Sequence, residues 1–177
     1  MRRSFFAGLA IVAMAVSLLT VVSSAAATDA SCTDYNFFAA RGTNAQEPDP
    51  LTDNMGPGNF EAMNQLKAVL TADGSTVSYS YVHYPATLID WPGGDFFNHL
   101  YDNSRETGVE DLTQRVDDLA DTCSSTKIVL FGYSQGADVI ANAIPGFSTT
   151  ARAMIAGVVA LGDPAFNGHD TAADDGT

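Results

Sequence analysis

The sequence predicts an α/β domain in which helices cover a central parallel sheet. Segments that are typical of strands alternate with segments of helical periodicity, in the order strand, helix, strand, helix, strand, helix, strand. Two of the strand segments, "KIVLFGY" (127–133) and "MIAGVVALGDP" (154–164), are apolar without interruption, which is typical of parallel strands buried on both faces. Right-handed crossovers are expected between such strands.

The first half of the chain supplies two strands and one helix. "YNFFAARGT" (35–43) predicts a buried strand that breaks into a loop at Arg-Gly. Residues 44–58 contain three prolines and two glycines and predict a surface loop. A helix follows, with its buried face marked at spacings of three, three and four by Phe60, Met63, Leu66 and Leu70. "STVSYSYVHYP" (75–85) alternates apolar and polar residues, which predicts a second strand that ends at Pro85.

The second half adds two helices and the two apolar strands. Residues 107–123 predict an amphipathic helix, because apolar residues recur at alternating spacings of three and four: Val109, Leu112, Val116, Leu119 and Cys123. "QGADVIANAI" (135–144) predicts a helix that stops before Pro145. We expect the aromatic stretch Ile89–Asn103 to be a loop, and the tail 167–177 carries no strand or helix signal.

The amino terminus has the form of a secretory signal peptide, which we place at residues 1–27. A basic start precedes an apolar run from Phe5 to Val22, and Ala25-x-Ala27 offers a cleavage site. The alternative is an uncleaved anchor helix, because the apolar run is long for a signal. We therefore expect a secreted, extracellular protein whose mature domain spans residues 28–177, without integral membrane association.

The charge of the chain argues against nucleic acid as a partner. The formal net charge is −13, and it becomes −15 after removal of residues 1–27, which carry two arginines and no acid. Such a surface lacks the clustered cations that phosphate binding needs. No cysteine or histidine spacing predicts a zinc site, and nothing suggests a cofactor.

Secretion makes a disulfide between Cys32 and Cys123 permissible. That bridge would close a loop of about ninety residues and contribute roughly 4–5 kcal/mol in the chain-entropy model. A pair of free buried thiols is the alternative.

The stretch "LFGYSQGAD" (130–138) contains Gly-x-Ser-x-Gly between an apolar strand and a helix, which is the context of a nucleophile elbow. Ser134 is therefore the candidate nucleophile, and the backbone N–H of Gln135 a candidate oxyanion donor. The alternative is a strand–turn–helix junction in which Ser134 is only an N-cap. A second donor is expected from the loop after the first strand, where Thr43 offers an amide and a hydroxyl; alternatively, Gly42-Thr43 only shapes the exit from that strand.

Four stretches, "FFAARGT", "YVHYPA", "STKIVLFGYSQGADV" and "VVALGDPAF", resemble the cutinase family of secreted serine esterases, which includes acetylxylan esterases and actinobacterial cutinase-like proteins. The resemblance covers residues 32–167 and implies an α/β-hydrolase-like three-layer sandwich with a central parallel sheet. It implies Ser134 as nucleophile, Thr43 and Gln135 as the oxyanion hole, and Cys32–Cys123 as the family's first disulfide. It also implies ester substrates, from cutin and acylglycerols to acetylated polysaccharide.

The chain departs from the family pattern after the Gly-Asp-Pro motif at residues 162–164. The family carries its catalytic acid and histidine beyond this point, and the sequence stops at Thr177. We therefore expect a domain without the C-terminal strand and helix, an exposed apolar edge at the strand ending near Gly162, and impaired activity. His169 could replace the base, although a solvated tail residue is the simpler interpretation.

The remaining candidates are weaker. His83 is expected to be a partly buried packing residue, His99 a surface loop residue, and Asp163 a residue that tightens the strand exit before Pro164. Trp91 and Phe96 could form an apolar wall for the acyl chain or could only cover the core. Besides an esterase, the sequence allows a non-catalytic secreted binding protein with the same fold, or an acyltransferase or thioesterase on the same elbow.

Overall fold

The computed structural model describes residues 32–45, 47–87 and 95–166. The predicted signal peptide, Trp91, His169 and the tail lie outside these residues, as does the side chain of Phe96.

A four-stranded parallel sheet forms the centre of the molecule. The strands are β1 (Tyr35–Ala40), β2 (Val77–Tyr81), β3 (Lys127–Tyr133) and β4 (Ile155–Leu161), in the order β2-β1-β3-β4. Ala40 lies opposite Gly132, which in turn lies opposite Ala160. Because the strands are parallel, the loops that follow β1 and β3 leave the sheet side by side, at the carboxyl ends of the strands.

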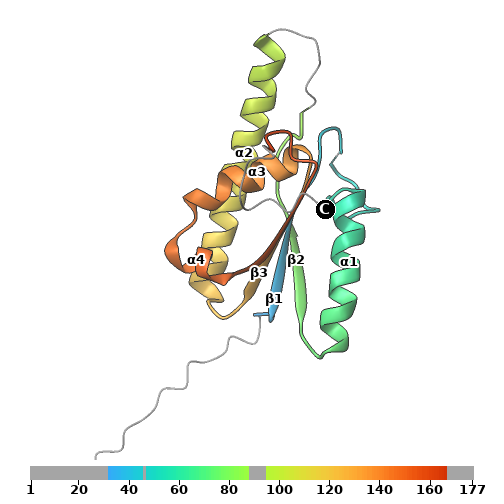
Figure 1. Cartoon of the computed structure of the whole chain (residues 1–177), viewed down its shortest axis with the longest axis vertical. Coiled ribbons are helices and arrows are strands. Elements are labelled where there is room, and N and C mark those ends of the chain that lie inside the picture. The colour runs from blue at the N-terminus through green and yellow to red at the C-terminus, as the bar shows by residue number, and fades with distance from the viewer. Residues whose placement is uncertain (1–31, 46, 88–94, 167–177) are drawn as a thin grey trace, which may run out of the picture.

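Helices cover both faces of the sheet (Figure 1). α1 (Pro57–Ala72) lies on one face, and α2 (Asp95–Thr122), α3 (Gln135–Ala143) and the short α4 (Thr149–Met154) lie on the other. The alternation along β1 determines the two cores, since Phe37 and Ala39 pack with Met63 of α1, whereas Phe38 and Ala40 pack with residues of α2 and α3. The predicted three-layer α/β sandwich with a parallel sheet is confirmed.

Helix α2 corrects one prediction, because residues 95–103 are helical and not part of a loop. Its buried face continues from Leu112 back through Gly108 and Ser104 to Tyr101. Ser104 and Gly108 occupy two of these buried positions. Aliphatic residues there would have continued the apolar periodicity from which a helix is predicted. The packing at Gly108 is tight, since a Cβ there would lie 3.0 Å from Val139 Cγ2 and 3.1 Å from Tyr84 Cγ.

Helix α4 and the one-turn 3-10 helix η1 (Ile144–Gly146) are also absent from the sequence prediction. Ser148 caps α4, with its hydroxyl accepting a hydrogen bond from the Ala151 amide at 3.1 Å. A six-residue helix is too short for its periodicity to be recognised.

A disulfide joins Cys32 and Cys123, whose Cα atoms are 5.6 Å apart. The bond ties the segment before β1 to the end of α2 and closes a loop with a sequence separation of 91. Oxidised cysteines, and not free thiols, are therefore present in the folded domain.

Among the described strands, β4 pairs only with β3 and is one of the two edge strands, β2 being the other. Val158 and Leu161 are 45% and 44% exposed, as expected for an uncovered apolar edge. Within the described ranges, no helix is both long and apolar enough to cross a membrane.

Candidate active site

Ser134 occupies a strained turn between β3 and α3. Its φ of 51° and ψ of −121° lie in a region that non-glycine residues rarely adopt. The turn is fixed by its backbone, because the Ser134 amide donates to Leu161 O of β4 at 2.8 Å and Ser134 O accepts from the Ala137 amide at 2.8 Å. The half-buried side chain makes no capping hydrogen bond to α3. The hydroxyl is thus not occupied as a helix cap.

The two glycines of the motif are sterically required. A Cβ at Gly132 would lie 2.7 Å from the backbone N of Ala137. A Cβ at Gly136 would lie 1.9 Å from Ala40 O, at the end of β1. These contacts are shorter than any side chain tolerates, so the sharp turn depends on the absence of both side chains.

Gln135 begins α3 and offers a free backbone N–H, since no described residue accepts from it. Its fully buried side chain approaches Tyr101 O, with Nε2 at 3.4 Å. The Tyr101 hydroxyl donates to the buried Asp138 at 3.0 Å. Burial raises the pKa of the Tyr101 phenol above its ordinary value, and the neighbouring Asp138 charge adds to the rise, so the phenol remains a neutral donor. Tyr101 therefore connects α2 to the first turn of α3 at two points.

The Thr43 loop touches the elbow. A Cβ at Gly42 would lie 2.6 Å from Tyr133 Cδ1 and 3.2 Å from Tyr133 O, so the residue before Thr43 packs directly on the residue before Ser134. The loop turns tightly, with the Ala45 amide donating to Gly42 O at 3.2 Å. Asn44, at φ 63°, donates its amide to Ala86 O at 3.0 Å. Thr43 itself is half-buried.

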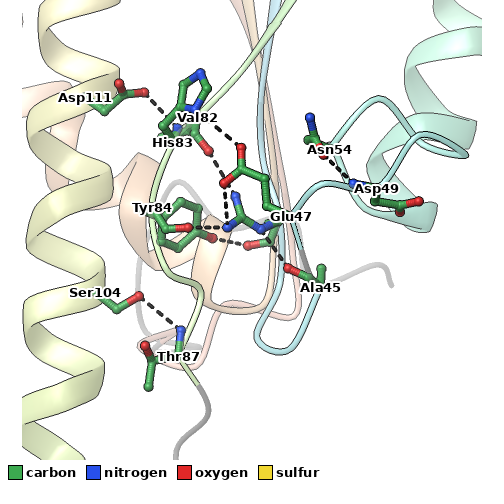
Figure 2. Close-up of polar contacts among 11 residues, drawn as sticks. Ala45, Glu47, Asp49, Asn54, Val82, His83, Tyr84, Thr87, Ser104 and Asp111 are labelled. Atoms are coloured by element: carbon green, nitrogen blue, oxygen red, sulfur yellow. Dashed lines mark hydrogen bonds and ion pairs between the residues drawn. The ribbon is translucent and has the colours of Figure 1, made fainter.

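Arg41 is a feature of this loop that the sequence reading did not single out. Its side chain is only 2% exposed although it carries a charge. Carbonyl oxygens of Ala45, Val82 and Tyr84 and the carboxylate of Glu47 converge on the guanidinium (Figure 2). An arginine directly after the apolar run of β1 is the signal that could have identified it.

A pocket of about 590 Å³ borders the Thr43 loop. Residues 42–45 form one wall, and Met55–Asn59, where α1 begins, form another. The ring of Tyr133, which is half-exposed, lies between Gly42 and Gly58. The pocket thus extends to Tyr133, the residue before the candidate nucleophile.

The described histidines do not meet Ser134. His83 follows β2 and is 42% exposed, with Nδ1 3.3 Å from Glu47 Oε1 and its ring against Tyr81. β1 separates β2 from β3, so His83 is not beside the elbow. His99 is exposed on α2 and is therefore not a loop residue as predicted. Asp163 tightens the exit from β4, as predicted, because Oδ1 accepts the Ala165 amide at 2.8 Å.

The comparisons with known proteins identify the family of the chain. The cutinase family model matches residues 31–174. A cutinase of Hypocrea jecorina is 31% identical over 75% of this chain, and a probable cutinase 3 of Aspergillus fumigatus is 33% identical over 92% of it. The matches cover 47% and 71% of those relatives, respectively, so the chain spans about half the length of the first.

Solved structures give the same result. An acetylxylan esterase superposes with a TM-score of 0.59 at 26% identity, covering 78% of this chain and 67% of that one. A Trichoderma reesei cutinase in complex with a phosphonate inhibitor superposes with a TM-score of 0.50 at 28% identity, covering 75% and 53%. The chain belongs to the cutinase family.

Proposed function

We propose that this chain is a secreted carboxylic ester hydrolase of the cutinase type, with Ser134 as its nucleophile. The observation that carries the proposal is the Ser134 turn, whose positive φ and uncapped hydroxyl fit a nucleophile elbow. The contact of this turn with the Gly42-Thr43 loop supports a shared site.

The proposed reaction proceeds through an acyl-serine. Ser134 Oγ attacks the ester carbonyl carbon while a base takes its proton, and the carbonyl oxygen becomes an oxyanion held by the amides of Gln135 and Thr43 and the Thr43 hydroxyl. Collapse of this intermediate releases the alcohol, which takes up the proton, and leaves the acyl group on Ser134. Water then attacks the acyl-serine and releases the carboxylic acid.

The base is the missing part of the described site. Neither His83 nor His99 contacts Ser134, so an imidazole must come from outside the described residues. In the proposed reaction this imidazole takes the Ser134 proton, and His169 is one candidate for it.

The substrate class follows from the relatives and from the site. The matched proteins are named cutinases and acetylxylan esterases, which favours a cutin, acylglycerol or acetylated polysaccharide ester. The net charge of −13 favours an uncharged ester over an anionic one. A disulfide between distant cysteines supports an extracellular location.

Hydrolysis of an activated acetyl ester by the purified chain tests the proposal. We expect release of the alcohol above the buffer rate, and a fall to the buffer rate in Ser134→Ala, because the other groups of the site cannot form an acyl-enzyme. Equal rates for both proteins would contradict the proposal and favour a non-catalytic binding protein with this fold.

A further inference from the structure

The side chain of Arg41 is buried, and it makes several polar contacts in the interior of the domain. Its Nε donates to Ala45 O at 2.7 Å and Nη1 donates to Val82 O at 3.2 Å. Nη2 donates to Tyr84 O and lies 3.3 Å from Glu47 Oε2 (Figure 2). The Tyr84 hydroxyl donates in return to Arg41 O. The guanidinium therefore joins the loop after β1 to the segment after β2.

We propose that Arg41 is a positioning residue that holds the Gly42–Ala45 loop, and with it Thr43, against the nucleophile elbow. The inference rests on the oxyanion-hole role proposed above for Thr43. Arg41 lies on one side of Thr43 in sequence, and its side chain binds Ala45 O on the other side. The loop between them is closed into a ring by that hydrogen bond and by the Ala45 amide bound to Gly42 O.

The same arginine sits at the contact between the loop and the elbow. A Cβ on Gly136 would lie 1.9 Å from Ala40 O and 2.8 Å from Arg41 O. The first turn of α3 therefore packs directly against the backbone of residues 40 and 41. A shift of this backbone would change the separation of the Thr43 and Gln135 amides. An oxyanion hole requires both donors at fixed positions before the reaction begins.

A purely stabilising role explains the contacts less well. A buried charge carries a desolvation cost, and well-packed apolar residues often stabilise a core as much or more. Three backbone carbonyls and one carboxylate can be bound at once only by the planar fork of an arginine, because a lysine offers one nitrogen. Burial raises the pKa of the Tyr84 phenol above its ordinary value, which keeps its hydroxyl a donor to Arg41 O.

Amide hydrogen exchange in Arg41→Lys tests the positioning directly and needs no catalysis. We expect the amides of Asn44 and Ala45 to exchange about tenfold faster or more, because the hydrogen bonds that hold the loop are lost. The matched control is Arg152→Lys, since Arg152 also donates to a backbone carbonyl, Pro145 O, but lies on α4. Unchanged exchange at residues 44 and 45 in Arg41→Lys would overturn the inference.

The second readout separates positioning from general stability. With a fluorophosphonate, we expect the maximal rate constant of Ser134 modification to fall about tenfold or more in Arg41→Lys, while the half-saturating concentration stays within about twofold. Glu47→Gln, which keeps the arginine, should fall less. An equal rate constant in the wild type and Arg41→Lys would also overturn the inference.

Two further outcomes are distinguishable. If Arg41→Lys does not fold, Glu47→Gln replaces it in the exchange experiment. Because this variant removes only the carboxylate partner of Arg41 and keeps its carbonyl contacts, a smaller acceleration of exchange at residues 44 and 45 is then required. If the wild type is not modified by the fluorophosphonate, the proposed function fails, and hydrogen exchange still decides whether Arg41 fixes the loop.

Discussion

At Gly136 the backbone of the elbow approaches Ala40 so closely that one added carbon atom has no space. In a helix interior, glycine to alanine normally stabilises, by about 1 kcal/mol. Here the added Cβ would lie 1.9 Å from Ala40 O, and because that neighbour is backbone, it cannot rotate away.

We predict that Gly136→Ala lowers the free energy of unfolding by about 3 kcal/mol, the upper range for overpacking in a core. Gly146→Ala is the control, because a Cβ there lies no closer than 3.8 Å to Thr113, and its effect should stay within about 0.5 kcal/mol. Urea unfolding of both variants measures the difference. Equal stability of the two alanine variants would show that the elbow is not packed against β1 as described.

The residues of the proposed site differ in how far the sequence alone can point to them. Ser134, Gln135 and Thr43 could be proposed because the strand–turn–helix context and the glycines are visible along the chain. Arg41 could not, because its importance depends on carbonyls of Val82 and Tyr84, which are about forty residues away in sequence.

At the scale of elements, Asp34 joins the segments that lead into the parallel strands β1 and β2. The carboxylate of Asp34 accepts hydrogen bonds from the amide and the hydroxyl of Thr76, each at 2.7 Å. The backbone hydrogen bond from Thr76, followed by its hydroxyl, holds the pKa of Asp34 below its usual range.

Because the folded-state pKa is lower than the unfolded one, Asp34 stabilises the fold fully above the unfolded pKa of about 3.9 and loses this contribution as the pH falls through the folded value. We predict that Asp34→Asn lowers the urea midpoint at pH 7 and that the difference from wild type disappears well below pH 4. Asp121→Asn, a change at an exposed acid of α2, provides the control. A difference that persists unchanged at low pH would contradict the assigned cause.

The element boundaries were predictable where periodicity was strong. All four strands and α1 and α3 lie close to their expected positions, because their apolar residues follow the spacing of a strand or a helix. The start of α2 was missed, since Ser104 and Gly108 occupy its buried face and its first residues follow a glycine-rich stretch.

At the scale of the whole molecule, one covalent bond spans most of the described domain. The Cys32–Cys123 disulfide encloses β1, α1, β2 and α2, and leaves β3, α3 and β4 outside the loop. Its main effect is expected on the unfolded chain, whose freedom it restricts.

We predict that replacing both cysteines with serine lowers the free energy of unfolding by about 4–5 kcal/mol, as chain entropy gives for a loop of this length. The oxidised and reduced wild-type proteins should differ by a similar amount, whereas the reductant should not affect the double variant. A change below about 1 kcal/mol would mean that the bond contributes little, through residual structure in the unfolded state.

The overall architecture could be predicted from the sequence because alternating strands and helices with apolar parallel strands admit few topologies. The strand order β2-β1-β3-β4 and the contact between the loops after β1 and β3 required the structure. The exposed apolar edge at β4 was predicted from the sequence, and it is present among the described strands.

Mass spectrometry of the chain after treatment with a fluorophosphonate tests the nucleophilic role of Ser134 most directly. The account predicts one phosphonyl adduct, located on the peptide that contains Ser134, and no adduct in Ser134→Ala. Repeating the treatment with His169→Ala shows whether that histidine is the base. If it is, the rate of Ser134 modification should fall. An unmodified wild-type chain, or an adduct on any other residue, would contradict the claim that this turn presents an activated serine.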